Sequence, residues 1–231
     1  GELEGQVEQV QALLGARARR GALELDTQET RVLLDDTGKV SQVAPVQRND
    51  AHRLIEECMV AANVAAARYV IKHKTPALFR IHDGAKPDGL DALRTYLANV
   101  GLTLPGGTKP EPKHYLGLLS KAKARPDWAL IQVMVLRSLS QAVYSPDNIG
   151  HFGLALEMYA HFTSPIRRYA DLVLHRALKS IIKGPRRAPY GYSHEQLVSI
   201  GEHVSMTERR ADDATREALN WLKCEYMLDK V

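Results

Sequence analysis

Apolar positions recur at helical spacing along most of this chain and alternate in only a few short stretches. The spacing predicts an amphipathic helix over residues 2–18 and a long helix from its caps, Asn49 and Asp50, to about Lys74. Further helices are predicted over residues 88–100, 111–123 and 127–144. The chain is therefore expected to be rich in helix.

The last predicted helix opens at the capping box of Ser193 and Gln196 and runs to about Asp229. At ~1.5 Å per residue it would be roughly 55 Å long. Short apolar or alternating stretches predict strands over residues 22–25, 30–46, 77–82 and 151–159, with a hairpin turn at 36–39. The fold class is thus α+β, with a small antiparallel sheet near the N-terminus and long helices towards the C-terminus.

The stretch from His161 to Tyr169 carries the strongest local signal. Ser164 is a favourable N-cap, Pro165 suits the first helical position, and apolar residues follow at helical spacing. We therefore predict that a helix begins at Ser164.

Arg167 and Arg168 fall in the first turn of this predicted helix, where the positive end of the helix dipole disfavours each cation by roughly 0.3–1 kcal/mol. A bound anion would compensate, because free backbone N–H groups and two guanidinium groups can hold a phosphate. Asp171 would orient Arg167 as its i, i+4 partner. The alternative is an ordinary surface helix whose arginines lie in water.

Basic residues also recur along this predicted helix, opposite its apolar positions. They are Arg168, His175, Lys179 and Lys183, with Arg176 adjacent. Such a stripe can follow a nucleic-acid backbone, or it is a solvated face. A net charge of +4 and a pI of about 9.0 favour an anionic partner without requiring one.

The remaining features point to no separate chemistry. His82 beside Asp83 is either an acid–base pair or a structural histidine at a strand end. Cys58 and Cys224 lack the paired spacing of a zinc site or a disulfide framework, which fits a reducing, cytoplasmic setting. Without a run of eighteen apolar residues or a signal peptide, no contact with a membrane is expected.

The residues around the predicted helix start resemble a known family. Residues 150–172, continuing to His175 and Arg176, resemble the signature of the ribonuclease II / ribonuclease R (RNB-type) exoribonuclease family over more than twenty positions. Residues 48–59 and 205–212 also resemble this family and favour its ribonuclease R branch. The resemblance identifies residues 1–231 as the C-terminal portion of such a catalytic domain.

The resemblance implies a cytoplasmic 3′→5′ exoribonuclease that degrades single-stranded RNA processively, uses Mg²⁺ and releases nucleoside 5′-monophosphates. Arg167 matches the arginine expected to stabilise the charge on the scissile phosphate, and Glu208 matches an acidic residue near the catalytic chamber. Together with the basic stripe, the expected RNA-binding residues are Thr163, Ser164, Arg168, Tyr169, His175, Arg176 and Lys179.

The chain departs from this family in its carboxylates. Two divalent ions commonly activate the attacking water, and several closely spaced carboxylates hold them. The pairs Asp35–Asp36, Glu56–Glu57 and Asp212–Asp213 have no convincing metal-site spacing, so no metal ligand is assigned. The family carries its metal-binding aspartates in an earlier part of the catalytic domain that this sequence lacks, and its C-terminal OB-fold domain would begin about where this chain stops. Leu25 also aligns where the family has a base-stacking aromatic residue.

Two classes of function follow. The first is half of a ribonuclease R-like active site, inactive alone and completed by an upstream segment or an associated N-terminal fragment of the same protein. The second is an RNA-binding or scaffolding module without catalytic activity. An aspartate cluster encoded upstream would favour the first.

Overall fold

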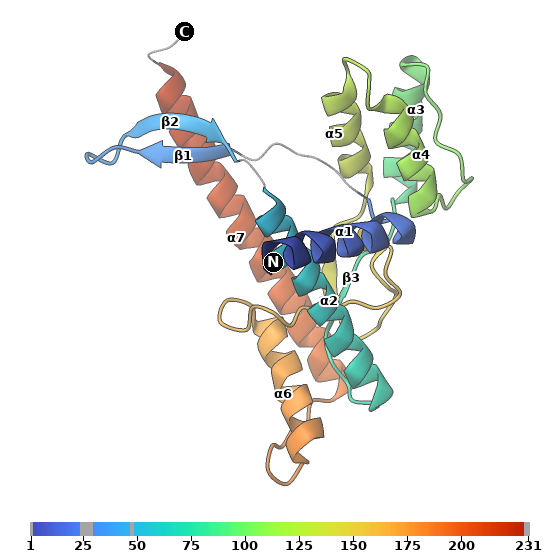
Figure 1. Ribbon diagram of the computed structural model, residues 1–231, viewed down its shortest axis with the longest axis vertical. Coiled ribbons are helices and arrows are strands. Elements are labelled where there is room, and N and C mark those ends of the chain that lie inside the picture. Colours follow the sequence, from blue (N-terminus) through green and yellow to red (C-terminus); the bar gives the residue numbers. More distant parts are fainter. Residues whose placement is uncertain (1, 24–29, 47–48, 229–231) are drawn as a thin grey trace.

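The computed structural model describes residues 2–23, 30–46 and 49–228 and confirms a helix-rich α+β fold (Figure 1). Its helices are α1 (Glu2–Arg20), α2 (Asp50–Lys72), α3 (Pro87–Asn99), α4 (Pro112–Ala122), α5 (Trp128–Ser138), α6 (Tyr169–Lys183) and α7 (His194–Leu228). The strands are β1 (Thr30–Leu34), β2 (Val40–Pro45), β3 (Phe79–Ile81) and β4 (Val143–Ser145), and a short 3₁₀ helix, η1, spans Phe152–Leu154. Within the described residues, the strands form two antiparallel pairs, β1 with β2 and β3 with β4.

The helices α3, α4 and α5 enclose one hydrophobic core, seen as a separate group in Figure 1. Tyr115, Leu97 and Ile131 are completely buried between them. The ring of Phe152 packs edge-on against Tyr115, with 5.6 Å between the ring centroids. This contact joins the three-helix group to η1 and thereby to the central part of the molecule.

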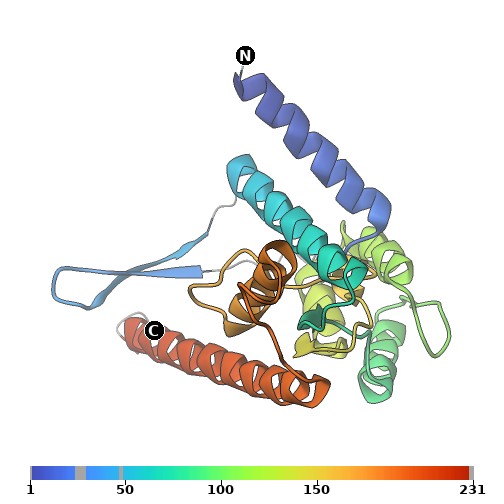
Figure 2. The same cartoon turned by 90° about the horizontal axis from the view of Figure 1, so that it is seen from below.

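A second core lies between α2, α6, α7 and the β3–β4 pair (Figure 2). Small residues of α2, Ala66 and Ala67, face Ala177 of α6, so the two helices approach closely. At Gly201 of α7, an added Cβ would lie 2.6 Å from the carbonyl oxygen of Tyr144. The glycine therefore lets α7 pack directly on β4.

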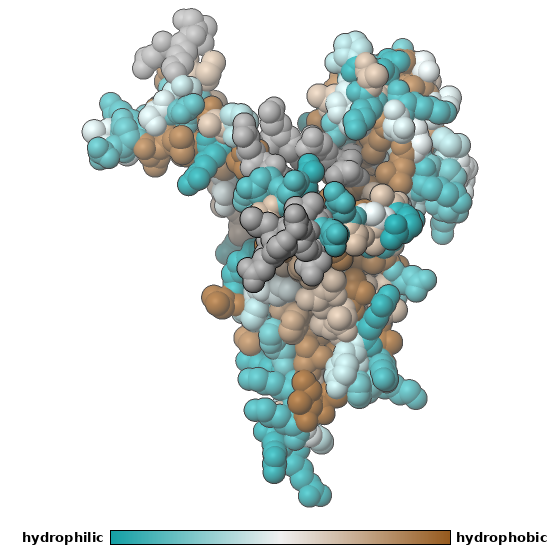
Figure 3. Space-filling model, viewed as in Figure 1, coloured by the Kyte–Doolittle hydropathy of each residue, from teal (hydrophilic) through white to brown (hydrophobic). Residues whose placement is uncertain are grey.

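The β1–β2 hairpin projects from the body and contacts α7 (Figure 1). Its turn is fixed by Asp35, whose Oδ1 accepts the backbone N–H groups of Thr37 and Lys39 at 2.9 and 3.0 Å. Gly38 adopts a positive φ of 81° there. In the space-filling view, an open notch separates this arm from the three-helix group (Figure 3).

Two predicted elements end differently in the structure. The helix predicted over 127–144 stops at Ser138, whose buried hydroxyl donates to the carbonyl oxygen of Val135 at 2.7 Å. Leu139 is extended, and Val143–Ser145 pairs with β3 instead. The predicted strand over 151–159 is wrong: η1 and a left-handed Ala155 (φ 49°) break it.

Other predicted boundaries lie close to the observed ones. The long helix after Asn49 is confirmed, because the Asn49 side chain accepts the backbone N–H of His52 at 3.0 Å. The predicted strand over 22–25 is irregular at Ala22 and Leu23, and its remainder, including Leu25, lies outside the described residues. Asp229 also lies outside them. Among the described residues, no helix combines the length and the apolar character needed to cross a lipid bilayer.

Candidate phosphate-binding site

The segment from Ser164 to Arg168 is a turn that precedes α6. The backbone N–H groups of Arg167 and Arg168 donate to the carbonyl oxygen of Ser164 at 3.3 and 3.1 Å, and α6 begins only at Tyr169. The predicted helix start at Ser164 is therefore wrong. The physical reason is Asp171, whose Oδ1 accepts the backbone N–H of Ser164 at 2.8 Å and thereby holds the segment in a non-helical turn.

Asp171 is completely buried and pairs with Arg168. Its two carboxylate oxygens accept bonds from Nε and Nη2 of Arg168, both at 2.9 Å. Such a two-bonded pair is strong and fixes the planes of both groups. The predicted pairing of Asp171 with Arg167 is therefore wrong by one residue.

Arg167 is left exposed beside this fixed turn. Its side chain has no hydrogen bond or ion pair with any of the residues that the structure describes. The Oγ1 atom of Thr163 is buried and likewise has no hydrogen-bond partner there. The turn thus presents one uncompensated guanidinium group to solvent.

Asn63 of α2 holds the irregular segment that leads into this turn. Its amide nitrogen donates to the hydroxyl of Tyr159 at 2.9 Å, and its Oδ1 accepts the backbone N–H of Phe162 at 2.9 Å. Asn63 is buried on a face of α2 that is apolar from Val60 to Val70 apart from this residue. The isolated asparagine was the available sequence signal, and sequence reasoning missed it.

His161, just before the turn, is buried beside Tyr144 and neutral. The Tyr144 hydroxyl and Nδ1 of His161 are 2.8 Å apart. Burial raises the pKa of Tyr144 to about 12, so the phenol stays protonated. Burial, assisted by the charges of Arg168, Arg80 and Arg167, lowers the pKa of His161 to about 3.

The rings of His82 and His151 pack together next to the same segment, with 5.0 Å between their centroids. The Nδ1 of His82 accepts the backbone N–H of Gly153 at 2.9 Å, and its Nε2 donates to the carbonyl oxygen of Ser140 at 2.7 Å. Burial lowers the pKa of both histidines, that of His151 to about 3. Because both ring nitrogens of His82 are occupied, the structural role predicted as one alternative for it is the correct one.

Glu208 of α7 forms an ion pair with Arg80 of β3. Nη1 of Arg80 lies 2.6 Å from Oε2 of Glu208, and the two side chains are 15% and 29% exposed. The Arg80 guanidinium also lies over the ring of Tyr144, 4.5 Å from its centroid. Sequence reasoning found Glu208 but not Arg80, which stands 128 residues earlier in the chain.

The predicted basic stripe is divided between different environments. Arg168 lies outside α6 and is tied to Asp171, whereas the exposed Lys179 lies on the helix surface. His175 is half-buried: its ring stacks on Phe162 with 4.4 Å between centroids, and Nε2 lies 2.8 Å from the Phe162 carbonyl oxygen. It therefore supports the segment before the turn.

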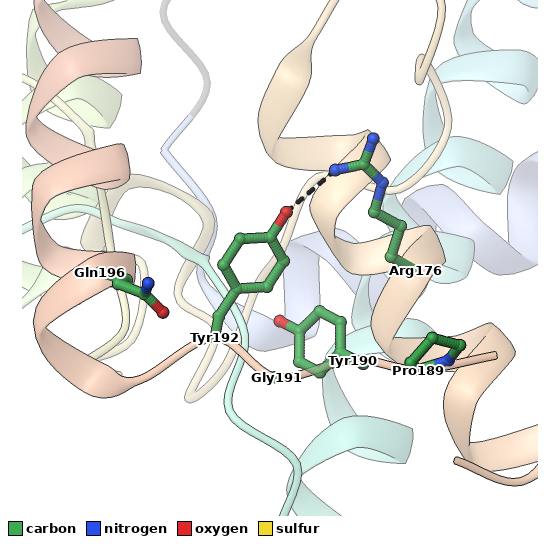
Figure 4. A pocket seen from close by; sticks show the side chains of 6 residues that line it. All are labelled: Arg176, Pro189, Tyr190, Gly191, Tyr192 and Gln196. Atoms are coloured by element: carbon green, nitrogen blue, oxygen red, sulfur yellow. Dashed lines mark hydrogen bonds between the residues drawn. The ribbon is translucent and has the colours of Figure 1, made fainter. Parts of the chain in front are cut away.

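Arg176 faces the loop that joins α6 to α7 (Figure 4). It donates to the hydroxyl groups of Tyr192 at 2.9 Å and Tyr169 at 3.4 Å, and these bonds raise its pKa. A surface pocket of about 370 Å³ lies beside it, lined also by Tyr190 and Gln196. Tyr169, the first residue of α6 after the turn, is 45% exposed.

A second cavity of about 310 Å³ lies between α2 and the turn. Asn63, Tyr159 and Arg168 line it together with His52 and Met59 of α2. The groups that fix the turn therefore also form the wall of a cavity.

The carboxylates do not gather into a metal site in the part of the chain that the structure describes. Asp35 belongs to the hairpin turn, Asp213 pairs with Arg216 on exposed α7, and Glu57 pairs with Arg17 of α1 at 2.6 Å. These residues do not fit a divalent ion by themselves.

Comparison with known proteins places these features in context. Residues 2–184 match the RNB domain. Ribonuclease R of Escherichia coli (strain K12) is 50% identical over 224 residues, which are 94% of this chain and 28% of that protein. Ribonuclease R of Vibrio cholerae is 52% identical over 230 residues, or 96% of this chain and 28% of that protein. The chain thus spans 28% of the length of both relatives.

A solved structure shares the fold. The RNase R of Mycoplasma genitalium, determined in complex with ribose methylated single-stranded RNA, superposes with a TM-score of 0.86 at 25% identity. The match covers 96% of this chain and 35% of that one.

Proposed function

Since the chain belongs to the RNB domain family, we propose that it supplies the phosphate-binding part of a 3′→5′ exoribonuclease active site. The enzyme would degrade single-stranded RNA processively to nucleoside 5′-monophosphates, with residues 1–231 as the C-terminal portion of its catalytic domain. One observation carries the proposal: Asp171 takes up Arg168 and leaves Arg167 exposed on a fixed turn.

Arg167 is the group that contacts the scissile phosphate. Its guanidinium group can donate two parallel hydrogen bonds to non-bridging oxygens, and it carries no competing partner among the described residues. A donor that is already in place stabilises charge as it develops on the phosphate without further reorganisation. Thr163 Oγ1, buried without a partner, gains one when the RNA backbone reaches the turn.

The other expected RNA contacts divide into direct and supporting ones. Lys179 is exposed and suits a phosphate, while Tyr169 is exposed enough to stack on a base. Arg176 donates to the Tyr169 hydroxyl at 3.4 Å. Ser164, Arg168 and His175 act mainly by holding the turn.

Mg²⁺ belongs to this proposal only as a cofactor of the completed enzyme. Because the described residues do not fit it, its ligands would come from a segment outside this chain, either upstream or in an associated N-terminal fragment. A divalent ion of this kind supplies an activated water and neutralises charge. We place the enzyme in the cytoplasm, where Cys58 and Cys224, both free and exposed, would stay reduced.

Binding and cleavage of RNA by this chain test the proposal directly. We expect the purified chain to bind 5′-labelled single-stranded RNA, in the presence of magnesium, without shortening it. Arg167→Ala should weaken binding about tenfold or more, since a charge-assisted hydrogen bond contributes ~1.5–3 kcal/mol. Arg137→Ala, at an exposed arginine of α5, is the matched control and should bind like the wild type. Clean 3′→5′ shortening by the chain alone would contradict the half-site.

Catalysis is tested in a chimaera in which this chain replaces the corresponding segment of E. coli ribonuclease R. The chimaera should degrade single-stranded RNA from its 3′ end, and Arg167→Ala within it should lower kcat at least a hundredfold. A folded chimaera that binds RNA without degrading it would instead indicate an RNA-binding module.

A further inference from the structure

We infer that Arg80 is a positioning residue of the RNA site, which neutralises and orients the Glu208 carboxylate so that it does not repel RNA bound at Arg167. The inference rests on the proposed function and extends it to an arginine outside the turn. Three observations carry it: the immobilisation of Arg80, the position of the Arg80–Glu208 pair beside the turn, and the charge balance that results.

Arg80 is held on three sides. Its backbone N–H donates to the carbonyl oxygen of Tyr159 at 2.8 Å. Its guanidinium lies over the ring of Tyr144, and Nη1 reaches Oε2 of Glu208 at 2.6 Å. A side chain with only 15% exposure and these contacts has little freedom to leave the carboxylate.

The pair lies close enough to the turn to act on it electrostatically. The residue that accepts the Arg80 backbone bond, Tyr159, stands two positions before His161. Arg80 and Arg167 both act on His161, lowering its pKa, and Glu208 acts on Tyr144, the hydrogen-bond partner of His161. Direct contacts also join the pair to the segment before the turn, because the Arg80 guanidinium that holds Glu208 lies over the ring of Tyr144, whose hydroxyl is 2.8 Å from Nδ1 of His161.

The Arg80–Glu208 pairing decides the net charge next to the turn. Without Arg80, the partly buried Glu208 would place an uncompensated negative charge beside a site that must attract phosphate. Like-charge repulsion weakens association and is screened less when the charge is partly buried. With Arg80 present, the pair is nearly neutral and Arg167 dominates. The Oε2 atom of Glu208 is fixed at the same time.

If the Arg80–Glu208 pair only stabilised the fold, its substitutions would affect RNA binding differently. A double-mutant cycle therefore separates charge compensation from a purely structural role. We would measure binding of fluorescently labelled single-stranded RNA to the full chain as wild type, Arg80→Met, Arg80→Lys, Glu208→Gln and the double variant Arg80→Met/Glu208→Gln. Arg80→Met should weaken binding about tenfold, and Arg80→Lys should restore most of it. Glu208→Gln should tighten binding about threefold, because it removes the negative charge and leaves Arg80 in place.

The double variant is the decisive arm. If Arg80 acts by compensating charge, Arg80→Met/Glu208→Gln should bind within about twofold of wild type, because neither charge remains. Equal weakening of the single and double variants, or weaker binding by Glu208→Gln, would overturn the inference. If Arg80→Met does not fold, as judged by circular dichroism, the Glu208→Gln arm still decides.

Arg167→Ala separates this inference from the proposed function. Wild-type binding that Arg167→Ala abolishes, together with an unchanged affinity of Arg80→Met, would overturn the role of Arg80 alone. A wild-type chain that does not bind RNA would overturn both.

Discussion

Arg167 and Arg168 are adjacent in the chain and have different surroundings. Arg168 forms an ion pair with the buried Asp171, whereas Arg167 is exposed. The sequence predicted the residue types of the site but assigned Asp171 to the wrong arginine, because the i, i+4 rule presumes that the helix has already begun. Only the position of the first helical residue, Tyr169, decides which arginine Asp171 reaches.

Removal of the buried Asp171 charge should therefore lower the stability of the folded chain. Asp171→Asn should lower the free energy of unfolding by about 3 kcal/mol, since Arg168 would lose its carboxylate partner in a largely buried place. Urea denaturation of the chain measures this. Asp213→Asn is the matched control, because the Arg216–Asp213 pair is 66% and 57% exposed and should change stability by less than about 1 kcal/mol. An equal effect of both substitutions would refute the special role of the buried pair.

The buried histidines predict an acid-sensitive fold. Burial lowers the pKa of His151 and of His161 in the folded chain to about 3, below the ordinary value of 6.5. Below pH 6.5 the unfolded chain therefore binds more protons than the folded one, and stability falls progressively as the pH drops from about 6.5 to about 3. The free energy of unfolding, measured between pH 7 and 4, should decrease accordingly.

Substitution of one of these histidines should reduce that slope. His161→Gln retains an acceptor for the Tyr144 hydroxyl and should remove about one proton from the difference, or roughly 1.4 kcal/mol per pH unit. His203→Gln, at an exposed histidine of α7, should leave the slope unchanged. An unaltered slope in His161→Gln would show that His161 is not held neutral.

At the level of elements, two helix starts predicted from local capping residues are confirmed, whereas the one predicted at Ser164 is not. The capping residues Asn49 and Ser193 mark true helix starts because their side chains bond to backbone N–H groups within one turn. Predicted elements were wrong where contacts outside the local pattern decide the structure. Val143–Ser145 continues a helical pattern but pairs with β3, and His151 caps η1 instead of extending a strand.

Gly201 tests the contact between α7 and β4. Gly201→Ala should destabilise the chain by about 1–3 kcal/mol, because the new Cβ would meet the Tyr144 carbonyl oxygen at 2.6 Å. Gly117→Ala in α4 is the control of opposite sign. Nothing lies within 4 Å of its Cβ, so alanine should stabilise the helix by about 0.5–1 kcal/mol. Thermal unfolding of both variants measures the difference, and a stabilising Gly201→Ala would contradict the close packing.

At the scale of the whole molecule, family membership and the α+β fold are confirmed. The signature residues lie in one continuous stretch, which made them visible in the sequence. The Arg80–Glu208 pair was invisible there, because β3 and α7 meet only in the folded chain. Asn63 was detectable in principle as an amide at helical spacing among the apolar residues Val60, Ala67 and Val70.

The hairpin β1–β2 has a further consequence for the order of folding. It is synthesised well before its docking partner, α7. At ~5–20 residues per second, the ribosome needs on the order of ten seconds or more to pass from the hairpin to the end of α7. During this time both edges of the two-stranded pair stay open to other chains. The nascent protein should therefore be most prone to aggregation just before α7 emerges.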